Sequence, residues 1–314
     1  MSTSAPMGLA QLATITVTYN PDIALLREQL QALPTECPGV LVDNASETAL
    51  RTQIETLATE RPGTVLLRNA NNAGLAAAIN QGAKAVKEAY PQARFLLLLD
   101  QDSLPEVGSI ALLLDTFIAL QAQNKRPGCV GPMLVDATTG MQHGFHQMTR
   151  WRWTRAYPHR GSADPVRCAN LNGSGTLVPL ELFLELGGLE DALFIDHVDT
   201  EWSFRVQAHG YSVYGVPAAV FDHRMGEASR RIWLLGWRVW PWRSPLRHRY
   251  LFRNTLWLMR RSHVPAVWKF WAAIKLLLTT SVHAAADPRR GEQLRAMRQG
   301  LMEGLRAPPS SIAP

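Results

Sequence analysis

The sequence is poor in the features that mark disulfide-rich, zinc-binding or membrane-spanning proteins. It has three cysteines, odd in number and far apart: Cys37, Cys129 and Cys168. This spacing predicts neither a disulfide framework nor a zinc site, and it fits a reducing compartment. No uncharged apolar run is long enough to cross a bilayer, because the nearest candidate, residues 264–282, contains Lys269 and Lys275. Residues 1–12 lack a basic stretch followed by an apolar core, so we expect no signal peptide.

Two phosphate-binding motifs are also missing. No G-x-G-x-x-G follows the first expected strand, and the chain has no G-x-x-x-x-G-K-[ST]. A dinucleotide site would therefore lack its phosphate turn. The composition, with 46% apolar and 18% charged residues, is that of a folded globular protein, and 314 residues can hold one large domain with a substantial extension.

The first half of the chain alternates between strand and helix patterns. We expect strands at residues 14–20, 40–42, 64–67 and 95–99, and helices at 22–33, 46–57, 74–89 and 106–123. This alternation predicts right-handed βαβ units and a mainly parallel sheet flanked by helices, which is an α/β fold. The second half is less regular, with strands expected at 130–135, 213–216 and 219–221, a glycine turn entering a strand over 172–178, and helices at 179–186 and from 199.

An unbroken apolar run, Phe95 to Leu99, leads directly into Asp100 and Asp102. Such a run predicts a central strand covered on both faces, and open α/β sheets bind ligands at the carboxyl ends of their strands. In extended chain the two carboxylates would point to the same side and could hold one hard cation such as Mg²⁺. Taken alone, the pattern also fits a solvated acidic turn that caps the next helix.

Polar residues end the other expected strands as well, at Asn20, Asp43 and Asn69. Each could be a helix cap or a turn former. Together with Asp100 and Asp102 they outline one polar crevice along the same edge of the sheet.

A second group of acids, Asp196, Asp199 and Glu201, lies among apolar residues at the start of an expected helix. Three acids in such a place are costly unless they are solvated, capping or functional. They fit a first helical turn that suits the helix dipole, or a carboxylate held at a cleft as a general base. His223 follows an expected strand end, as the other acidic sites do, and is either structural or a ligand.

The C-terminal third is basic and rich in tryptophan. Residues 224–275 hold ten Arg and two Lys against one acid, Glu227, and seven of the ten Trp. We expect amphipathic helices over residues 226–285. Arg and Trp at this density fit a segment at a membrane interface, and they fit equally a helical layer with Trp in its core and Arg in solvent or on a diphosphate. No nucleic-acid-binding motif accompanies the charge, so we expect no nucleic-acid partner.

With these residues assembled, the sequence resembles the family-2 glycosyltransferases of the GT-A fold. Among them it looks most like the bacterial dTDP-L-rhamnosyltransferases of the O-antigen and rhamnolipid type. The resemblance covers residues 13–225 well and extends more weakly to about residue 262. Five segments carry it: Thr18–Pro21, Val42–Asn44, Asn72–Gly82, Leu99–Ser103 and Phe194–Arg205.

The resemblance implies a Rossmann-like, mixed and mainly parallel sheet with C-terminal amphipathic helices. It implies donor contacts from Thr18, Tyr19, Asn20, Asp43, Asn72, Gly74, Asn80, Asp100, Gln101 and Arg253. It also implies a divalent cation, Mg²⁺ or Mn²⁺, held by Asp102 and His223 together with Asp100. Asp199 falls on the family's base, and Asp196, Glu201 and Trp202 would lie on the acceptor side. Val198 and Glu201 replace the Glu and Asp that relatives carry at these positions, so Asp196 and Glu201 stay open as alternative bases.

We therefore expect inverting transfer of L-rhamnose from dTDP-L-rhamnose to a hydroxyl of a lipid-linked glycan or glycolipid, as in lipopolysaccharide or glycolipid biosynthesis. The alternatives are a UDP- or GDP-sugar donor, and a non-catalytic sugar-nucleotide or membrane-binding module. We expect an N-terminal tail over 1–12, a GT-A domain over 13–225, a basic Trp-rich helical extension over 226–306 and a disordered tail over 307–314. The expected location is cytoplasmic, peripheral on the cytoplasmic face of the inner membrane.

Overall fold

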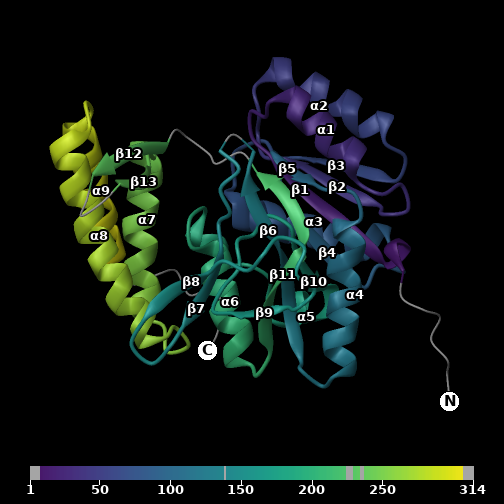
Figure 1. Cartoon of the computed structure of the whole chain (residues 1–314). Coiled ribbons are helices and arrows are strands. Elements are labelled where there is room, and N and C mark those ends of the chain that lie inside the picture. Colours follow the sequence, from purple (N-terminus) through teal and green to yellow (C-terminus); the bar gives the residue numbers. More distant parts are fainter. Residues whose placement is uncertain (1–7, 138, 224–228, 234–236, 307–314) are drawn as a thin grey trace.

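Four parallel strands form the N-terminal half of the central sheet in this computed structural model, which describes residues 8–137, 139–223, 229–233 and 237–306 (Figure 1). They follow the short 3₁₀ turn Leu9–Gln11 and lie in the order β3-β2-β1-β4: β1 (Leu12–Thr18), β2 (Gly39–Asp43), β3 (Thr64–Arg68) and β4 (Phe95–Asp100). Three helices connect them: α1 (Ile23–Ala32), α2 (Thr48–Glu60) and α3 (Leu75–Ala89). The predicted βαβ alternation is confirmed.

The second half of the sheet mixes directions. After β4 the order continues β10-β6-β11-β5, with β10 antiparallel to both neighbours, β11 parallel to β6, and β9 paired to β11 off this path. The strands are β5 (Ser103–Pro105), β6 (Pro127–Asp136), β9 (Val166–Cys168), β10 (Thr176–Pro179) and β11 (Ser212–His223). The helices are α4 (Ser109–Ala122), α5 (Leu180–Glu185), the 3₁₀ turn Asp191–Leu193 and α6 (Val198–Ala208). The two short strands expected at 213–216 and 219–221 are one strand, β11, whose register against β6 shifts between Val216 and Val220.

The leucine run of β4 is a central strand, as predicted. Leu96 and Leu98 join a core that includes α3, α5 and α6, whereas Leu97 and Leu99 join the core formed with α1, α2 and α4. Side chains alternate across a strand, so Asp100, next in the series of Leu96 and Leu98, belongs to the face that α6 covers. Asp100 can therefore be approached by the helices on that face, including α6.

Two hairpins differ from the predicted structure. Residues 137–165, expected to be mostly loop, contain β7 (Phe145–Met148) paired with β8 (Trp153–Ala156). Residues 229–241, expected to be helical, form β12 (Ser229–Trp233) and β13 (Trp237–Pro241). In residues 229–241, Ile, Val and Trp have high strand propensity, which favours strands over the helices that we expected there. Residues 1–7 of the expected N-terminal tail, residues 226–228 and 234–236 of the expected extension and the expected tail 307–314 lie outside the described residues.

Three C-terminal helices form a layer beside the sheet domain, at the left of Figure 1: α7 (Pro245–Met259), α8 (Ala266–Ala286) and α9 (Arg290–Gly304). Helices α7 and α9 approach closely at two glycines, because a Cβ on Gly300 would collide with the carbonyl oxygen of Arg249 and one on Gly304 would lie 2.9 Å from Leu256. Arg249 also pairs with Glu303 at 2.7 Å across the same contact. The layer is therefore a packed unit.

The tryptophans of this layer are mostly core residues. Trp242, Trp257 and Trp268 are each at most 7% exposed, whereas Trp271 is 39% exposed. For the first three, the core interpretation replaces the one that places them at a membrane interface. None of the helices in the described ranges is both long and apolar enough to cross a bilayer.

Candidate functional site

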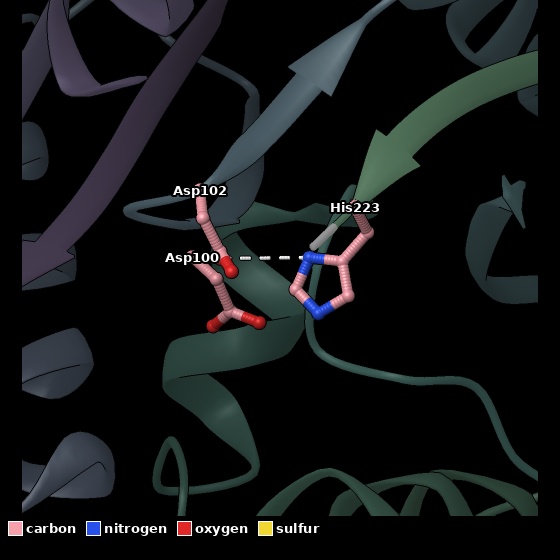
Figure 2. A group of neighbouring side chains, drawn as sticks. All are labelled: Asp100, Asp102 and His223. Atoms are coloured by element: carbon pink, nitrogen blue, oxygen red, sulfur yellow. Dashed lines mark ion pairs between the residues drawn. The ribbon is translucent and has the colours of Figure 1, made fainter. Parts of the chain in front are cut away.

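A cluster of two carboxylates and one imidazole lies where β4, β5 and β11 meet (Figure 2). Asp100 ends β4, Asp102 lies in the next turn and His223 ends β11. One possible ligand atom from each lies within 4.8 Å of the others, and Asp102 Oδ1 is 3.5 Å from His223 Nδ1. The antiparallel pairing of β5 with β11 sets Ser103 opposite His223, which brings His223 to the turn. Oxygen and imidazole donors in this arrangement suit a divalent cation.

The two aspartates meet through a tight turn and not along extended chain, so the expected geometry was wrong although the pairing was right. The buried side chain of Gln29 on α1 holds this turn. Its Nε2 donates to the carbonyl oxygens of Asp100 and Ser103 at 2.5 and 2.7 Å, and its Oε1 accepts from Thr16 at 3.0 Å. Sequence reasoning missed Gln29. An uncharged polar residue beside Leu26 and Leu30 on the apolar face of α1 was the available signal.

Asp199 lies in the first turn of α6, on the same face of the sheet as Asp100. Its Oδ1 accepts from the backbone nitrogen of Thr200 at 2.8 Å, and its Oδ2 accepts from that of Gly173 at 3.2 Å. Burial raises the pKa of Asp199 to about 6, and the negative charge of Asp100 adds to the rise while the two backbone hydrogen bonds oppose it. The ionisation of Asp199 is therefore coupled to the charge of Asp100 at the end of β4.

A glycine turn, residues 173–175, joins Asp199 to the carboxylate–histidine cluster. Gly173 binds Asp199, the hydroxyl of Ser174 hydrogen-bonds that of Ser103, and the nitrogen of Gly175 donates to the carbonyl of Leu98 at 2.7 Å. Gly175 has φ of +75°, and a Cβ there would lie 2.5 Å from Pro132. The sequence predicted this turn but not its part in the site.

The loop before α6 is strained. Phe194, Asp196 and His197 all have positive φ, between 62° and 65°, a region that side chains other than glycine rarely adopt. Helix α7 holds the loop through Asn254, whose buried Nδ2 donates to three carbonyl oxygens at 2.8 to 2.9 Å: those of Leu193, Ile195 and Asp196. The position of Asp199 therefore depends on Asn254, a residue more than fifty positions away in sequence.

Arg253, predicted to contact the donor, also faces this loop. Its guanidinium donates to the carbonyl oxygens of Ala192 and Leu193 at 2.7 and 3.1 Å and lies over the rings of Tyr250 and Trp257. The structure thus shows Arg253 as a support of the 3₁₀ turn Asp191–Leu193 that leads into this loop, and a contact with the donor stays a prediction.

The two alternative bases are engaged in ion pairs. Burial favours the neutral form of Asp196, but the charges of Arg243 and Arg247 lower its pKa overall. Glu201 pairs with Arg205 at 2.8 Å and with His263 at 3.1 Å. Both carboxylates therefore brace the loop and α6. Their predicted place on the acceptor side has no support in these contacts.

Trp202 lies in the core rather than at an acceptor surface. It is 6% exposed and packs on Phe183 with ring centroids 5.9 Å apart. Its position one turn along α6 turns the ring towards the sheet, and the sequence pattern alone did not distinguish that direction from the cleft.

Predicted donor contacts at the ends of β1 and β2 gather at one edge of the sheet. Thr18 donates to Asp43 Oδ1 at 3.4 Å, and the buried Asp43 Oδ2 accepts no hydrogen bond from the described residues, with Arg51 Nε 3.8 Å away. Tyr19 is half exposed, and its backbone nitrogen donates to Gln101 Oε1 at 2.8 Å. An acceptor without a hydrogen bond and an exposed ring at neighbouring strand ends suit a nucleoside. The amide of Asn20 differs, since its Oδ1 accepts from the backbone nitrogen of Glu47 and so ties the end of β1 to the residue before α2.

Three predicted donor residues between Asn72 and Asn80, at the start of α3, make contacts within the protein. Asn72 Oδ1 accepts from Asn44 Nδ2 and from the nitrogen of Gly74, both at 2.9 Å. Gly74 has φ of +88° and packs so tightly on Phe194 that a Cβ would lie 2.6 Å from its ring. The Asn80 amide bonds to Leu189 and Asp191. Gly74 thus brings the start of α3 to Phe194, and Asn80 ties α3 to Leu189 and Asp191. The predicted contacts of the three residues with a nucleotide remain predictions.

Comparison with known proteins agrees with this geometry. Residues 15–158 match the family model described as Glycosyl transferase family 2. The chain is 26% identical to the dTDP-rhamnosyl transferase RfbF of Shigella flexneri over 298 residues, which are 95% of this chain and 96% of that protein.

Solved structures share the fold at low sequence identity. A GalNAc-T7 structure with UDP, GalNAc and Mn²⁺ matches 95% of the chain with a TM-score of 0.56 and 18% identity, and the chain spans only 55% of its length. The mannosyltransferase PcManGT from Pyrobaculum calidifontis, in complex with GDP-Man and Mn²⁺, matches 94% of the chain and 86% of its own, with a TM-score of 0.53 and 16% identity. S. aureus TarS 1-349 matches 94% of the chain and 80% of its own, with a TM-score of 0.54 and 11% identity.

Proposed function

We propose that this chain, a glycosyltransferase with a family-2 domain of the GT-A fold, transfers L-rhamnose from dTDP-L-rhamnose to an acceptor hydroxyl. The observation that carries the donor assignment is the similarity to a dTDP-rhamnosyl transferase along almost the whole of both chains. The site agrees with transfer, because a cluster suited to a cation is joined through a glycine turn to Asp199, a carboxylate on which the charge of Asp100 acts.

The leaving group of such a reaction is a nucleoside diphosphate, on which negative charge develops as the sugar departs. Asp100, Asp102 and His223 would hold Mg²⁺ or Mn²⁺, which supplies neutralisation of that charge without proton transfer. Asp43 and Tyr19, at the same edge of the sheet, would receive the nucleoside. Gln29 would keep the turn between the two aspartates in place.

Asp199 would act as the general base that takes the proton of the acceptor hydroxyl. With a pKa of about 6 it is mostly ionised at neutral pH yet basic enough to accept a proton. Asp196 and Glu201 are held in ion pairs, which supports Asp199 over them. A single displacement with this one base inverts the anomeric centre. A retaining route would need a second carboxylate placed as a nucleophile, and neither ion-paired acid is available for that.

The nucleotide panel is the decisive experiment on the donor. Thermal unfolding of the full chain with Mg²⁺ should be shifted upward by dTDP-rhamnose and dTDP more than by UDP- or GDP-sugars, because ligands that bind the native state raise its midpoint. Release of dTDP from dTDP-rhamnose should follow. A larger shift with a UDP- or GDP-sugar would reassign the donor, and binding without any turnover under any condition would favour a non-catalytic module.

We further propose that the acceptor is a lipid-linked glycan or glycolipid and that the enzyme works at the cytoplasmic face of the inner membrane. Helix α8 supports this, since its apolar residues at helical spacing are exposed: Phe270, Trp271, Leu277 and Leu278. Trp271 donates to the carbonyl of Trp151, which is 74% exposed and follows Arg150, so rings and a cation share this surface. Three free cysteines fit the reducing side of the membrane.

Flotation with phosphatidylglycerol vesicles tests the membrane surface. Leu277→Asp should reduce the bound fraction several-fold, because a charge replaces an apolar side chain at the interface. Leu112→Asp on α4, 40% exposed before the change, is the matched control and should bind as the wild type does. Equal binding of the two variants would remove α8 as the docking surface.

A further inference from the structure

A buried asparagine joins the nucleoside side of the site to the turn before α3. Asn44 follows Asp43, the carboxylate proposed to receive the nucleoside. The Asn44 Oδ1 accepts from the backbone nitrogen of Ala73 at 2.9 Å, and its Nδ2 donates to the carbonyl oxygen of Gly74 at 3.2 Å. A ligand bound at Asp43 therefore lies one residue from the side chain that holds the 73–74 backbone.

Phe194, the first residue of the 194–199 loop, packs on the same turn. Its carbonyl oxygen accepts from the backbone nitrogen of Leu75 at 2.6 Å, which pairs one of the N–H groups left free at the start of α3. A Cβ on Gly74 would lie 2.6 Å from the Phe194 ring and 2.8 Å from its Cα, so a larger residue has no room there. A movement of this turn towards the loop would therefore displace Phe194.

Tyr250 of α7 stacks on the Phe194 ring. The two rings are inclined by only 11° and their centroids lie 4.7 Å apart, a distance at which aromatic pairs attract. The guanidinium of Arg253 lies over the Tyr250 ring at 4.6 Å, and it also donates to the carbonyl oxygen of Leu193 at 3.1 Å. Phe194 is therefore held by the C-terminal layer through Tyr250 and by the start of α3 through Gly74.

The backbone that follows Phe194 leads to the proposed base. Phe194, Asp196 and His197 all have positive φ, so few conformations connect the ring to the helix that follows. Helix α6 begins at Val198, and Asp199 is its second residue. Because this connection is short and restricted, a displacement of Phe194 would also move the carboxylate of Asp199.

The ring pair lies apart from the hydrophobic cores. Both side chains are half-buried, and neither belongs to a hydrophobic cluster of the residues that the structure describes. Burial of apolar surface therefore accounts for only part of this contact. Asn254 differs from the pair, because it binds carbonyl groups of the loop and makes no hydrogen bond to α3 among the described residues. Of these supports, Phe194 is the one that touches both the turn before α3 and α7.

We propose that Phe194 and Tyr250 are positioning residues that transmit donor binding to the loop carrying Asp199, an inference that rests on the transferase function proposed above. A bound nucleotide stabilises Asn44 and the 73–75 backbone, and this backbone stabilises Phe194 against Tyr250. The donor binds the ordered arrangement more tightly than the loose one, and so it shifts the loop towards order. The base is then held most firmly when the sugar nucleotide is in the site.

Amide hydrogen exchange with and without dTDP tests this coupling. The full chain is saturated with dTDP in the presence of Mg²⁺, and mass spectrometry follows exchange in peptides that cover residues 72–78 and 194–201. In the wild type dTDP should slow exchange by at least about three-fold in both segments, because both belong to one ordered arrangement. In Tyr250→Leu, which removes the ring contact, dTDP should slow exchange in residues 72–78 alone. Phe194→Leu removes the other ring and should reproduce this result.

Two further variants separate coupling from a loss of stability. Tyr250→Phe keeps the ring and should restore protection of both segments. Tyr211→Leu is the matched control, because Tyr211 is a half-buried tyrosine under the guanidinium of Arg126, just before β11, and should leave both segments as in the wild type. A purely structural role for Tyr250 would reduce the amount of folded protein and leave the protection pattern of the folded fraction unchanged.

Turnover gives a second measurement. Hydrolysis of dTDP-rhamnose by water should show kcat lowered by about ten-fold in Tyr250→Leu, because the base is less well oriented. The affinity for dTDP in calorimetry should fall by no more than about three-fold, since coupling between two sites is reciprocal.

Three results of the exchange experiment would overturn the inference. They are protection of both segments in Tyr250→Leu, failure of bound dTDP to protect residues 194–201 in the wild type, and a Tyr250→Phe protein that behaves as Tyr250→Leu does. Each of these leaves the transferase function intact as long as dTDP binds. A wild-type protein that binds no dTDP in calorimetry would instead contradict the donor on which the proposed function depends.

Discussion

The two halves of the site are built in opposite ways. The carboxylate–histidine cluster is local, since Asp100 and Asp102 belong to one turn and His223 comes beside them by strand pairing. Asp199 instead follows a strained loop that owes its shape to α7, through Asn254 and Arg253, and to the ion pairs of Asp196. The sheet alone positions the carboxylate–histidine cluster, whereas the position of Asp199 depends also on the C-terminal helical layer.

This difference predicts that damage to the two halves has different signatures. Changes near the cluster should weaken metal-dependent donor binding. Changes in the 194–199 loop, or in the helix that supports it, should spare donor binding and slow turnover.

The largest effect is expected for Asp199→Asn. Loss of a general base lowers kcat by about a thousand-fold, within the range typical of proton transfer by a positioned side chain. The amide keeps the shape of the carboxyl, so affinity for dTDP-rhamnose should be unchanged in calorimetry. Turnover within ten-fold of the wild type would exclude Asp199 as the base.

Asp102→Asn should act on the other half, with donor affinity in the presence of Mg²⁺ reduced by about ten- to a hundred-fold, the loss typical of a disturbed metal site. The metal concentration for half-maximal activity should rise in parallel, as measured by titration of the apo protein. Asp115→Asn is the matched control, because Asp115 is an exposed residue of α4. An unchanged metal requirement would show that the cation binds elsewhere.

Asn254→Ala tests whether α7 supports the Asp199 half of the site and not the carboxylate–histidine cluster. It removes three hydrogen bonds to the loop and leaves buried carbonyl groups unpaired, so stability should fall by about 1–3 kcal/mol in denaturant unfolding. We expect kcat to fall by about ten-fold because Asp199 is no longer held in place, with donor affinity retained. Gln299→Ala on the exposed side of α9 should alter neither quantity. A loss of donor affinity instead would mean that α7 supports both halves.

The smallest effect concerns pH. The pKa of Asp199 is raised from 3.8 to about 6 in the folded chain, so the proposed base would be protonated and inactive below that pH. The kcat should rise with pH, reach half its maximum near pH 6 and level off above about pH 7. Residual turnover in Asp199→Asn should lack this limb. A flat wild-type profile between pH 5 and 7 would show that another group accepts the proton.

The sequence predicted the residues at the strand ends, but it did not predict the side chains that support them from distant helices. The Leu96–Leu98 alternation, the pairing of Asp100 with Asp102 and the approach of His223 all depend on strand ends, which a hydrophobic pattern marks well. Asn254 and Gln29 carried no such mark, because each acts on backbone carbonyls far away in sequence.

The basic, Trp-rich segment shows where composition stops being informative. Trp257 and Trp268 pack in the core and Trp271 faces solvent, although all three have the same helical surroundings in the sequence. Whether each Trp is buried depends on which face of its helix packs against the rest of the protein, and the sequence does not show this. For the same reason Glu201 and Trp202 looked like acceptor contacts, while the packing of α6 assigns them to an ion pair and to the core.

The close contact of Gly300 and Gly304 with α7 has a consequence for the end of the chain. A bulky residue at either glycine would push α9 away from α7, and a frameshift before α9 would remove the helix that packs on α7. Neither change alters a residue of the site. The shortened protein should still load its sugar nucleotide but fail to hand the sugar on. A gene variant that ends before α9 would therefore produce a protein that binds the sugar nucleotide without transferring the sugar.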